Sequence, residues 1–232
     1  MPKTHAQPIS YTSAFQLFSL SKAAVKRNIT TFVVLVIVPS LLFLISNVID
    51  FPGRDNLFSS TQVEPSPAGL TFIILGVVLS ILFTPAAAVA AVAASQGKEI
   101  TYQEALKQSW PIFFKFYSLS ILIALAVLIG LILLIVPGII VLQRLFLAPY
   151  FLIDQKMDVI EALKQSSNQS KGKFAAIFGI IGVSLLLSLP AIIPLAGTFV
   201  AVVLGTLYYC APAMRYFEII KNKKLKPSAD AA

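Results

Sequence analysis

The chain has 232 residues, of which 57% are hydrophobic and only 12% are charged. A soluble domain has roughly 25% charged residues, which cover its apolar core, so this composition excludes a soluble globular protein. The single cysteine, Cys210, excludes an intramolecular disulfide, and the single histidine, His5, excludes a histidine-rich metal site. The sequence therefore predicts an all-α protein whose solvent is the lipid bilayer.

The first two predicted membrane spans are long uncharged runs. A helix needs about 20 apolar residues to cross roughly 30 Å of hydrocarbon. One run extends from Thr31 to Ile49 and the next from Leu70 to Ala94. We expect two separate spans, joined by a loop of 19 residues from Phe51 to Gly69.

Two later apolar stretches, residues 116–153 and 174–214, are each too long for one helix. Each is predicted to form a helical hairpin, because proline and glycine interrupt it near its middle. Arms of about 15 to 21 residues correspond to roughly 22–31 Å, which favours full crossing over turning back inside the membrane. The interrupting residues are Pro137 and Gly138 in the first stretch, and Pro190 and Pro194 in the second.

Positive charges orient the six predicted spans. Sixteen of the 18 lysine and arginine residues fall on the side that carries both termini, while Arg54 falls in an opposite loop and Arg144 within a span. Because cytoplasmic loops are enriched in these residues, we expect both termini in the cytoplasm and the protein in the bacterial cytoplasmic (inner) membrane. No cleavable signal peptide is evident, since the first apolar run is too long for one.

The predicted organisation has three parts. Residues 1–28 form a cytoplasmic segment with an amphipathic helix, residues 29–220 form a six-helix membrane domain, and residues 221–232 form a basic cytoplasmic tail. We therefore expect a polytopic membrane protein with interfacial amphipathic helices beside its spans.

A hexapeptide, Glu-Ala-Leu-Lys-Gln-Ser, occurs twice, at residues 104–109 and 161–166. Thr101 and Asp158 stand three residues before the two glutamates, which is the spacing of a helix capping box. Each copy therefore predicts the start of a helix. In the first copy Leu106 and Trp110 share a face, which indicates an amphipathic helix along the membrane surface.

A weaker third copy starts at Ser13, with Gln16 in the glutamate position of the capping box. If all three copies are related, the protein consists of three units, each with one interfacial helix followed by two spanning helices. The alternative is that only the last two copies are related.

The segment from Thr101 to Glu218 resembles a family of bacterial integral membrane proteins. The resemblance rests on Ala-Leu-x-x-Ser-Trp at residues 105–110, its partner at 162–167, and Val-Pro-Gly-Ile at 136–139 followed by Arg144. This family is YciC-like and is related to the membrane domain of some glycerophosphodiester phosphodiesterases. The resemblance implies a non-catalytic membrane module, because the hydrolase of those enzymes is a separate soluble domain and no stretch here is long enough to form one.

Arg144 is the only charged residue inside a predicted span, and such residues are candidates for function. Six residues separate it from Gly138, so we expect it about 9 Å from the external turn, where its side chain can reach the outer headgroups. A buried contact with Gln143 or backbone carbonyls, and a transport site, are the alternatives. Trp110 is expected at headgroup level, and Cys210 is expected to be a buried structural cysteine.

The lysines that follow the last span form the strongest predicted contact with lipid. Their position beside a membrane helix favours anionic headgroups on the cytoplasmic side and not nucleic acid. A membrane protein partner is also compatible with the sequence. The cluster consists of Lys221, Lys223, Lys224 and Lys226.

The sequence contains no phosphate-binding loop, catalytic carboxylate pair, nucleophile elbow or metal-ligand spacing. We therefore expect no cofactor and no enzymatic activity. The leading hypothesis is a structural or lipid-interacting module of the bacterial envelope. The main alternative is a small-solute transporter or permease subunit, which would need a polar cavity among the spans.

Overall fold

The structure is a computed structural model that describes residues 12–49, 66–192 and 196–224. Regular structure in these residues is helical. Six helical stretches in the described part of the chain are long and apolar enough to cross a membrane, so the protein has an all-α, multi-pass membrane fold, as predicted. The stretches are Ile29–Ile49, Pro67–Ser95, Tyr102–Leu133, Ile135–Asp154, Phe174–Ile192 and Gly197–Ile220.

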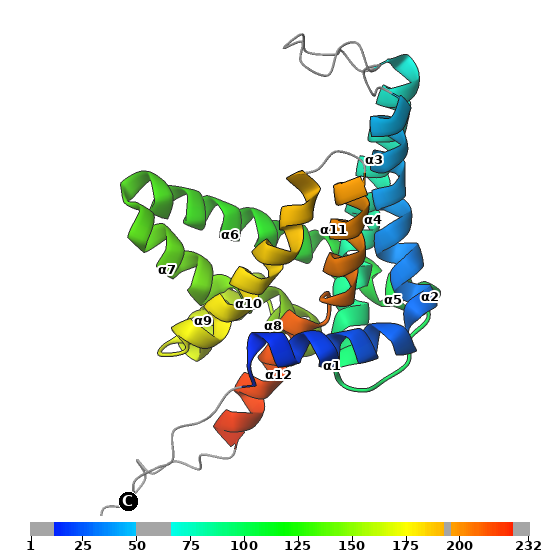
Figure 1. Cartoon of the computed structure of the whole chain (residues 1–232). Coiled ribbons are helices and arrows are strands. Elements are labelled where there is room, and N and C mark those ends of the chain that lie inside the picture. The colour runs from blue at the N-terminus through cyan, green and yellow to red at the C-terminus, as the bar shows by residue number, and fades with distance from the viewer. Residues whose placement is uncertain (1–11, 50–65, 193–195, 225–232) are drawn as a thin grey trace, which may run out of the picture.

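Helix α1 (Ala14–Arg27) begins at the capping box that the sequence predicts. The Gln16 N–H donates to Ser13 Oγ at 3.2 Å, and the Ser13 N–H donates to Gln16 Oε1 at 3.3 Å. In Figure 1 this helix runs across the base of the upright helices α3 and α11. It contacts α10, α11 and α12, which come from the other end of the chain.

The first span consists of α2 (Ile29–Phe32), a π-helical turn (Val33–Ile37) and α3 (Val38–Ile49). It packs along α4 (Pro67–Ser95), a single helix of 29 residues with Pro85 inside it. Small side chains allow close packing at the lower end of α4, where Ala86, Ala90 and Ala94 are buried. The sequence-predicted pair of spans is therefore confirmed, although the segment between them lies outside the described residues.

The next unit starts with α5 (Tyr102–Ser109), whose predicted capping box is present: the Glu104 N–H donates to Thr101 Oγ1 at 3.3 Å, and the Thr101 N–H donates to Glu104 Oε2 at 3.0 Å. A short 3-10 helix (Trp110–Ile112) leads into α6 (Phe113–Leu133), and α7 (Ile135–Leu145) returns from it. The predicted hairpin therefore forms.

The turn of this hairpin is not at Pro137 and Gly138, so that prediction is wrong. Leu134 is the one extended residue between α6 and α7 (φ −167°, ψ 147°), and Pro137 lies in the first turn of α7. Proline fits there because the first helical N–H groups have no partner within the helix. Gly138 packs against Gly130 of α6. A Cβ added to Gly130 would lie only 2.8 Å from the Gly138 Cα, so the two helices approach each other closely at this point.

The chain continues through α8 (Ala148–Asp154) to α9 (Val159–Ser170), which begins at the predicted capping box of Asp158 and Glu161. Helix α10 (Phe174–Ser188) ends in a 3-10 turn (Leu189–Ile192) that contains Pro190, as predicted. Pro194 lies outside the described residues. Helices α11 (Ala196–Leu207) and α12 (Ala211–Lys224) complete the fold.

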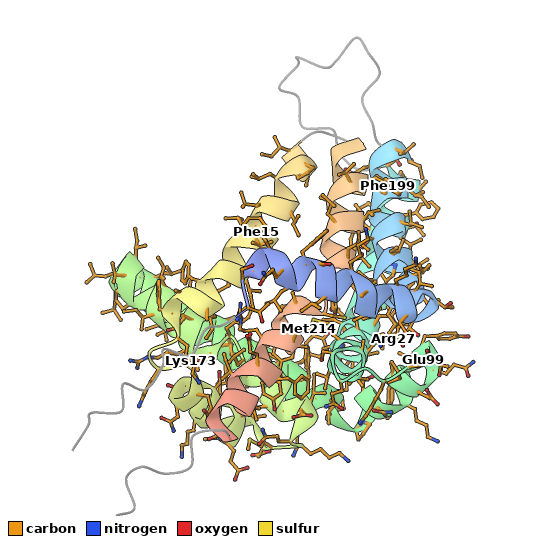
Figure 2. All side chains as sticks on the ribbon, turned by 60° about the horizontal axis from the view of Figure 1, so that its bottom comes forward. Phe15, Arg27, Glu99, Lys173, Phe199 and Met214 are labelled. Carbon is orange, nitrogen blue, oxygen red and sulfur yellow. The ribbon has the colours of Figure 1, made fainter. Side chains whose placement is uncertain are left out.

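The hairpin of α6 and α7 is set apart from the other membrane helices. In Figure 1, α3, α4 and α11 stand side by side, whereas α6 and α7 leave the bundle sideways. Side chains with nitrogen tips gather in the lower half of Figure 2, while the upper helices carry mainly carbon. The polar ends of the helices therefore lie together at one side of the molecule.

Candidate functional site

A pocket of about 500 Å³ opens where α4, α5, α6 and α8 come together. Two lysines and a glutamine lie on apolar walls, so the pocket suits a ligand that joins an anionic group to an apolar chain. We call it the basic pocket; its lining includes Val89, Gln108, Ile112, Lys115, Leu152 and Lys156.

Lys115 links the start of α6 to the start of α9. Its Nζ lies 3.1 Å from a carboxylate oxygen of Asp158, and both side chains are more than half exposed. The hydrogen bond from Lys115, its positive charge and the Val159 N–H lower the pKa of Asp158. Asp158 therefore stays ionised at neutral pH, where it caps α9 and holds the Lys115 ammonium at the rim of the pocket.

Lys156 has a strained backbone. Its φ of +51° lies in the left-handed region, and within the described residues it is the one non-glycine residue with a positive φ. A side chain with a Cβ rarely adopts this conformation, which glycine and asparagine tolerate better. Strain of this kind concentrates at functional sites, so the lysine at this turn between α8 and α9 marks the basic pocket as a candidate site.

A second cavity, of about 350 Å³, lies among α4, α6, α8, α10 and α11. Three tyrosines and two small hydroxyl side chains give it a limited polar lining. The Tyr208 hydroxyl donates to the Ala14 carbonyl at 3.4 Å, so that group is already engaged. We call this space the tyrosine cavity; its polar lining consists of Thr84, Tyr150, Ser184, Tyr208 and Tyr209.

Arg215 is a buried charge that the sequence analysis did not single out. It is 1% exposed, its Nη1 donates to Glu218 Oε2 one turn later on α12, and its Nη2 donates to the Thr12 carbonyl at 2.6 Å. The Thr12 N–H donates to the same carboxylate group, at 2.6 Å from Oε1. The cluster ties the beginning of α1 to α12, and the Arg-x-x-Glu spacing on one helix face was the available signal.

Arg144 does not lie near the turn of the hairpin, so the expected depth of about 9 Å is wrong. It stands at the far end of α7, ten residues after Leu134, and its side chain is exposed. Its carbonyl accepts a hydrogen bond from Ser166 Oγ at 2.7 Å. The neighbouring Gln143 is buried, and its Nε2 donates to the Ser170 carbonyl at 2.7 Å. Both residues therefore join α7 to α9.

Trp110 is 72% exposed and packs its ring against Phe113, with the ring centroids 6.1 Å apart. Phe114 beside them is also exposed. Such a group of aromatic side chains next to Lys115 has the composition of a membrane interface. The position of Trp110 at headgroup level remains a prediction.

Cys210 is buried, as expected, and its backbone N–H donates to Ser21 Oγ at 3.1 Å. Within the described residues no three His, Cys, Asp or Glu side chains come together as metal ligands would. Other predicted features lie outside the described residues: His5, Lys226, and the side chains of Lys221, Lys223 and Lys224.

Comparison with known proteins identifies a family. Residues 68–206, from the first turn of α4 to the last turn of α11, match the Uncharacterised protein family (UPF0259). This match covers more than half of the chain, so the chain belongs to that family. No curated protein and no solved structure matches the chain.

Proposed function

We propose that this protein is a non-enzymatic module of the bacterial cytoplasmic (inner) membrane that binds anionic phospholipid and acts structurally in the envelope. The resemblance to YciC-like proteins supports a membrane module without a catalytic domain. The proposed partners are anionic membrane lipids on the cytoplasmic side. A second membrane protein is also compatible with this proposal.

The basic pocket is the observation that carries this proposal. Lys156, and Lys115 beside its ion pair with Asp158, can meet a phosphate, while the partly exposed Ile112, Ile153 and Met157 offer apolar contact to the chains attached to it. Each lysine near an anionic membrane contributes about 1 kcal/mol of attraction. A pocket that combines both features favours a phospholipid over a soluble anion.

The proposed orientation places the basic pocket in the cytoplasmic leaflet, with both termini in the cytoplasm. The bias of sixteen basic residues against one supports it. Anionic lipids are abundant in that leaflet, so the pocket and its proposed ligand would lie at the same depth.

We also propose that the chain consists of three related units. Capping boxes open α1, α5 and α9, and each of these helices precedes two apolar arms. Three prolines support the same division: Pro149 comes 64 residues after Pro85, and Pro212 comes 63 residues after Pro149. Pro149 and Pro212 both line the tyrosine cavity.

The tyrosine cavity favours the alternative function, a small-solute transporter or permease subunit. Transport needs a polar space among the membrane helices, and Tyr150, Tyr209 and Ser184 provide hydroxyl groups in one. The alternative predicts solute uptake by vesicles that contain the protein. The lipid-binding proposal predicts no uptake above that of empty vesicles.

The lipid-binding experiment uses the purified protein and phosphatidylglycerol as the probe. Native mass spectrometry measures how much of this lipid stays bound after transfer from phosphatidylcholine nanodiscs that contain it as a minor component. Lys156→Asn keeps a residue that tolerates the left-handed backbone but removes the amine. We expect roughly fivefold weaker retention, which corresponds to about 1 kcal/mol.

Lys164→Asn is the matched control, because Lys164 is an exposed lysine of α9 outside the basic pocket. It should leave lipid retention unchanged. Equal retention in Lys156→Asn and the unmodified protein, or an equal loss in both variants, would overturn the proposed site. The same preparations should not hydrolyse glycerophosphodiesters above a heat-treated control.

A further inference from the structure

The turn between α6 and α7 is apolar and highly exposed. Every residue from Ile132 to Val136 is 66–77% exposed, and no charged residue occurs from Phe116 to Gln143. A turn that reaches water at the opposite membrane surface ordinarily carries polar residues. This one has the composition of a segment surrounded by hydrocarbon.

The backbone of the turn is suited to an apolar environment. The Leu134 N–H donates to the Gly130 carbonyl at 3.1 Å, and the Leu134 carbonyl accepts from the Gly138 N–H at 3.3 Å. Pro137 has no N–H that would need a partner. Because unpaired backbone groups are costly in hydrocarbon, a turn of one extended residue with both of its polar groups bonded is compatible with that environment.

The position of Arg144 sets the depth of the turn. Ten residues separate it from Leu134, which is about 15 Å along a helix, or half of a hydrocarbon layer of roughly 30 Å. If the turn lay at the opposite surface, the exposed Arg144 would lie near the bilayer centre, where a charge is least favourable. If Arg144 lies at headgroup level, the apolar turn lies at the bilayer centre.

The packing of α7 places Arg144 with the polar ends of the helices. Ser166 and Ser170 of α9 bond to the backbone carbonyl of Arg144 and the side chain of Gln143, and α9 begins at the Lys115–Asp158 ion pair. These bonds come from the second half of α9, a helix whose exposed side chains include Glu161, Lys164 and Asn168, so Arg144 lies against a polar helix and not beside the hairpin turn.

The direction of α6 agrees with this depth. Nineteen residues separate Lys115 from Leu134, about 28 Å along the helix, so α6 reaches only half of the bilayer if it is strongly tilted. Figure 1 shows such a tilt: α6 crosses the view while α3 and α4 stand upright, and its turn lies well below their upper ends.

We propose that the turn of the α6–α7 hairpin is a membrane-penetrating surface whose partner is the hydrocarbon at the bilayer centre. The hairpin enters and leaves through the same leaflet and does not cross. This conclusion is independent of the proposed lipid site, and it leaves both termini on one side. An apolar opening of about 610 Å³ beside the arms, lined by Ala124, Leu128 and Leu142, suits the acyl chains of that leaflet.

The test places single cysteines in a Cys210→Ala background and labels them with a membrane-impermeant maleimide. Right-side-out and inverted membrane vesicles expose the two faces in turn. Leu134→Cys and Ile135→Cys should react at least about tenfold less than accessible controls from both faces, because a thiol in hydrocarbon does not form the reactive thiolate. Both should react fully after denaturation in detergent.

The controls are cysteines at position 57, expected to react from outside, and Lys107→Cys, expected to react from the cytoplasmic side. Reaction of the turn cysteines from outside would show a crossing hairpin, and reaction from the cytoplasmic side would show a hairpin in water. Either result would overturn the proposal.

A second measurement needs no reactive thiol. Leu134→Trp in a Trp110→Phe background should be quenched most strongly by lipids that carry bromine at the ends of their acyl chains. Arg144→Trp in the same background should be quenched most strongly by bromine close to the headgroup. The reverse order would contradict the proposal.

Discussion

The pair of α3 and α4 and the pair of α6 and α7 are both apolar helical pairs, yet they are built differently. α4 is one helix of 29 residues beside a first span of 21, and the segment that joins α3 to α4 contains Asp50, Arg54, Asp55 and Glu64. The α6–α7 pair has one residue between its helices, and its second helix has only 11 residues.

This difference is the basis for our proposal that two equally apolar stretches meet the bilayer in different ways. Charged residues in a connection favour water, so the first pair is expected to cross the membrane. Five exposed apolar side chains at the α6–α7 turn would cost on the order of 5–10 kcal/mol in water. Hydropathy describes the helices, whereas the composition of the connection indicates whether that connection favours water or hydrocarbon.

The largest expected effect comes from placing a charge at the turn. Leu134→Lys should destabilise the hairpin by about 3 kcal/mol, because a lysine at the bilayer centre carries that cost. Ser59→Lys, in the connection between α3 and α4, is the matched control and should be silent. Thermal unfolding in nanodiscs measures both, and a silent Leu134→Lys would break the comparison.

The second largest effect should come from replacing a glycine by alanine at the helix contact of each pair. A Cβ at Gly130 would meet the Gly138 backbone at 2.8 Å, whereas a Cβ at Gly76 would meet the movable ring of Phe43 at 3.2 Å. We expect Gly130→Ala to cost about 1–3 kcal/mol. Gly76→Ala should be near neutral, since alanine favours the helix by about 1 kcal/mol. Equal changes in unfolding temperature would contradict this account.

Arg144→Lys should change stability by less than about 0.5 kcal/mol, because lysine also reaches the headgroups and the bond from Ser166 goes to the backbone. Arg215→Lys is the comparison variant. It should lose more stability, since the planar guanidinium of Arg215 bonds to Glu218 and to Thr12 in a buried site. Chemical unfolding distinguishes the two, and equal losses would place Arg144 in a buried site as well.

The smallest effect should come from pH. The pKa of Asp158 is lowered in the folded protein, so its contribution to stability is present above the ordinary aspartate range and is lost as pH falls through the lowered pKa. Asp158→Asn should remove this part of the acid dependence and its sensitivity to salt. An unchanged acid profile in that variant would show that the Lys115–Asp158 pair does not contribute.

The sequence was sufficient for the long apolar helices and for the capped starts of α1, α5 and α9. Uncharged length decides which stretches enter a membrane, and the spacing of Thr101 and Glu104 is a local signal that needs no tertiary structure. The turn differs from the prediction because proline can end a helix but is equally suited to the first turn of one, and Pro137 lies in the first turn of α7. Because the turn lies at Leu134 and not at Gly138, Arg144 is ten residues from it and not six.

The basic pocket could not be predicted in the same way. Lys115 and Lys156 are 41 residues apart, and only the packing of α6 against α8 brings them to one space. The strained backbone at Lys156 has no sequence signature. Arg215 escaped notice because the last apolar run ends at Met214, so its burial depends on the start of α1 at the other end of the chain.

The most direct test is a depth profile along α7 with spin labels at residues 134, 137, 141 and 144 in lipid bilayers. Oxygen concentrates at the bilayer centre and a water-soluble nickel complex stays outside, so their relative collision rates report depth. We expect residue 134 to lie deepest in the bilayer, and each later residue up to 144 to lie closer to the membrane surface. A profile that is shallow at residue 134 and deepens toward residue 144 would contradict it.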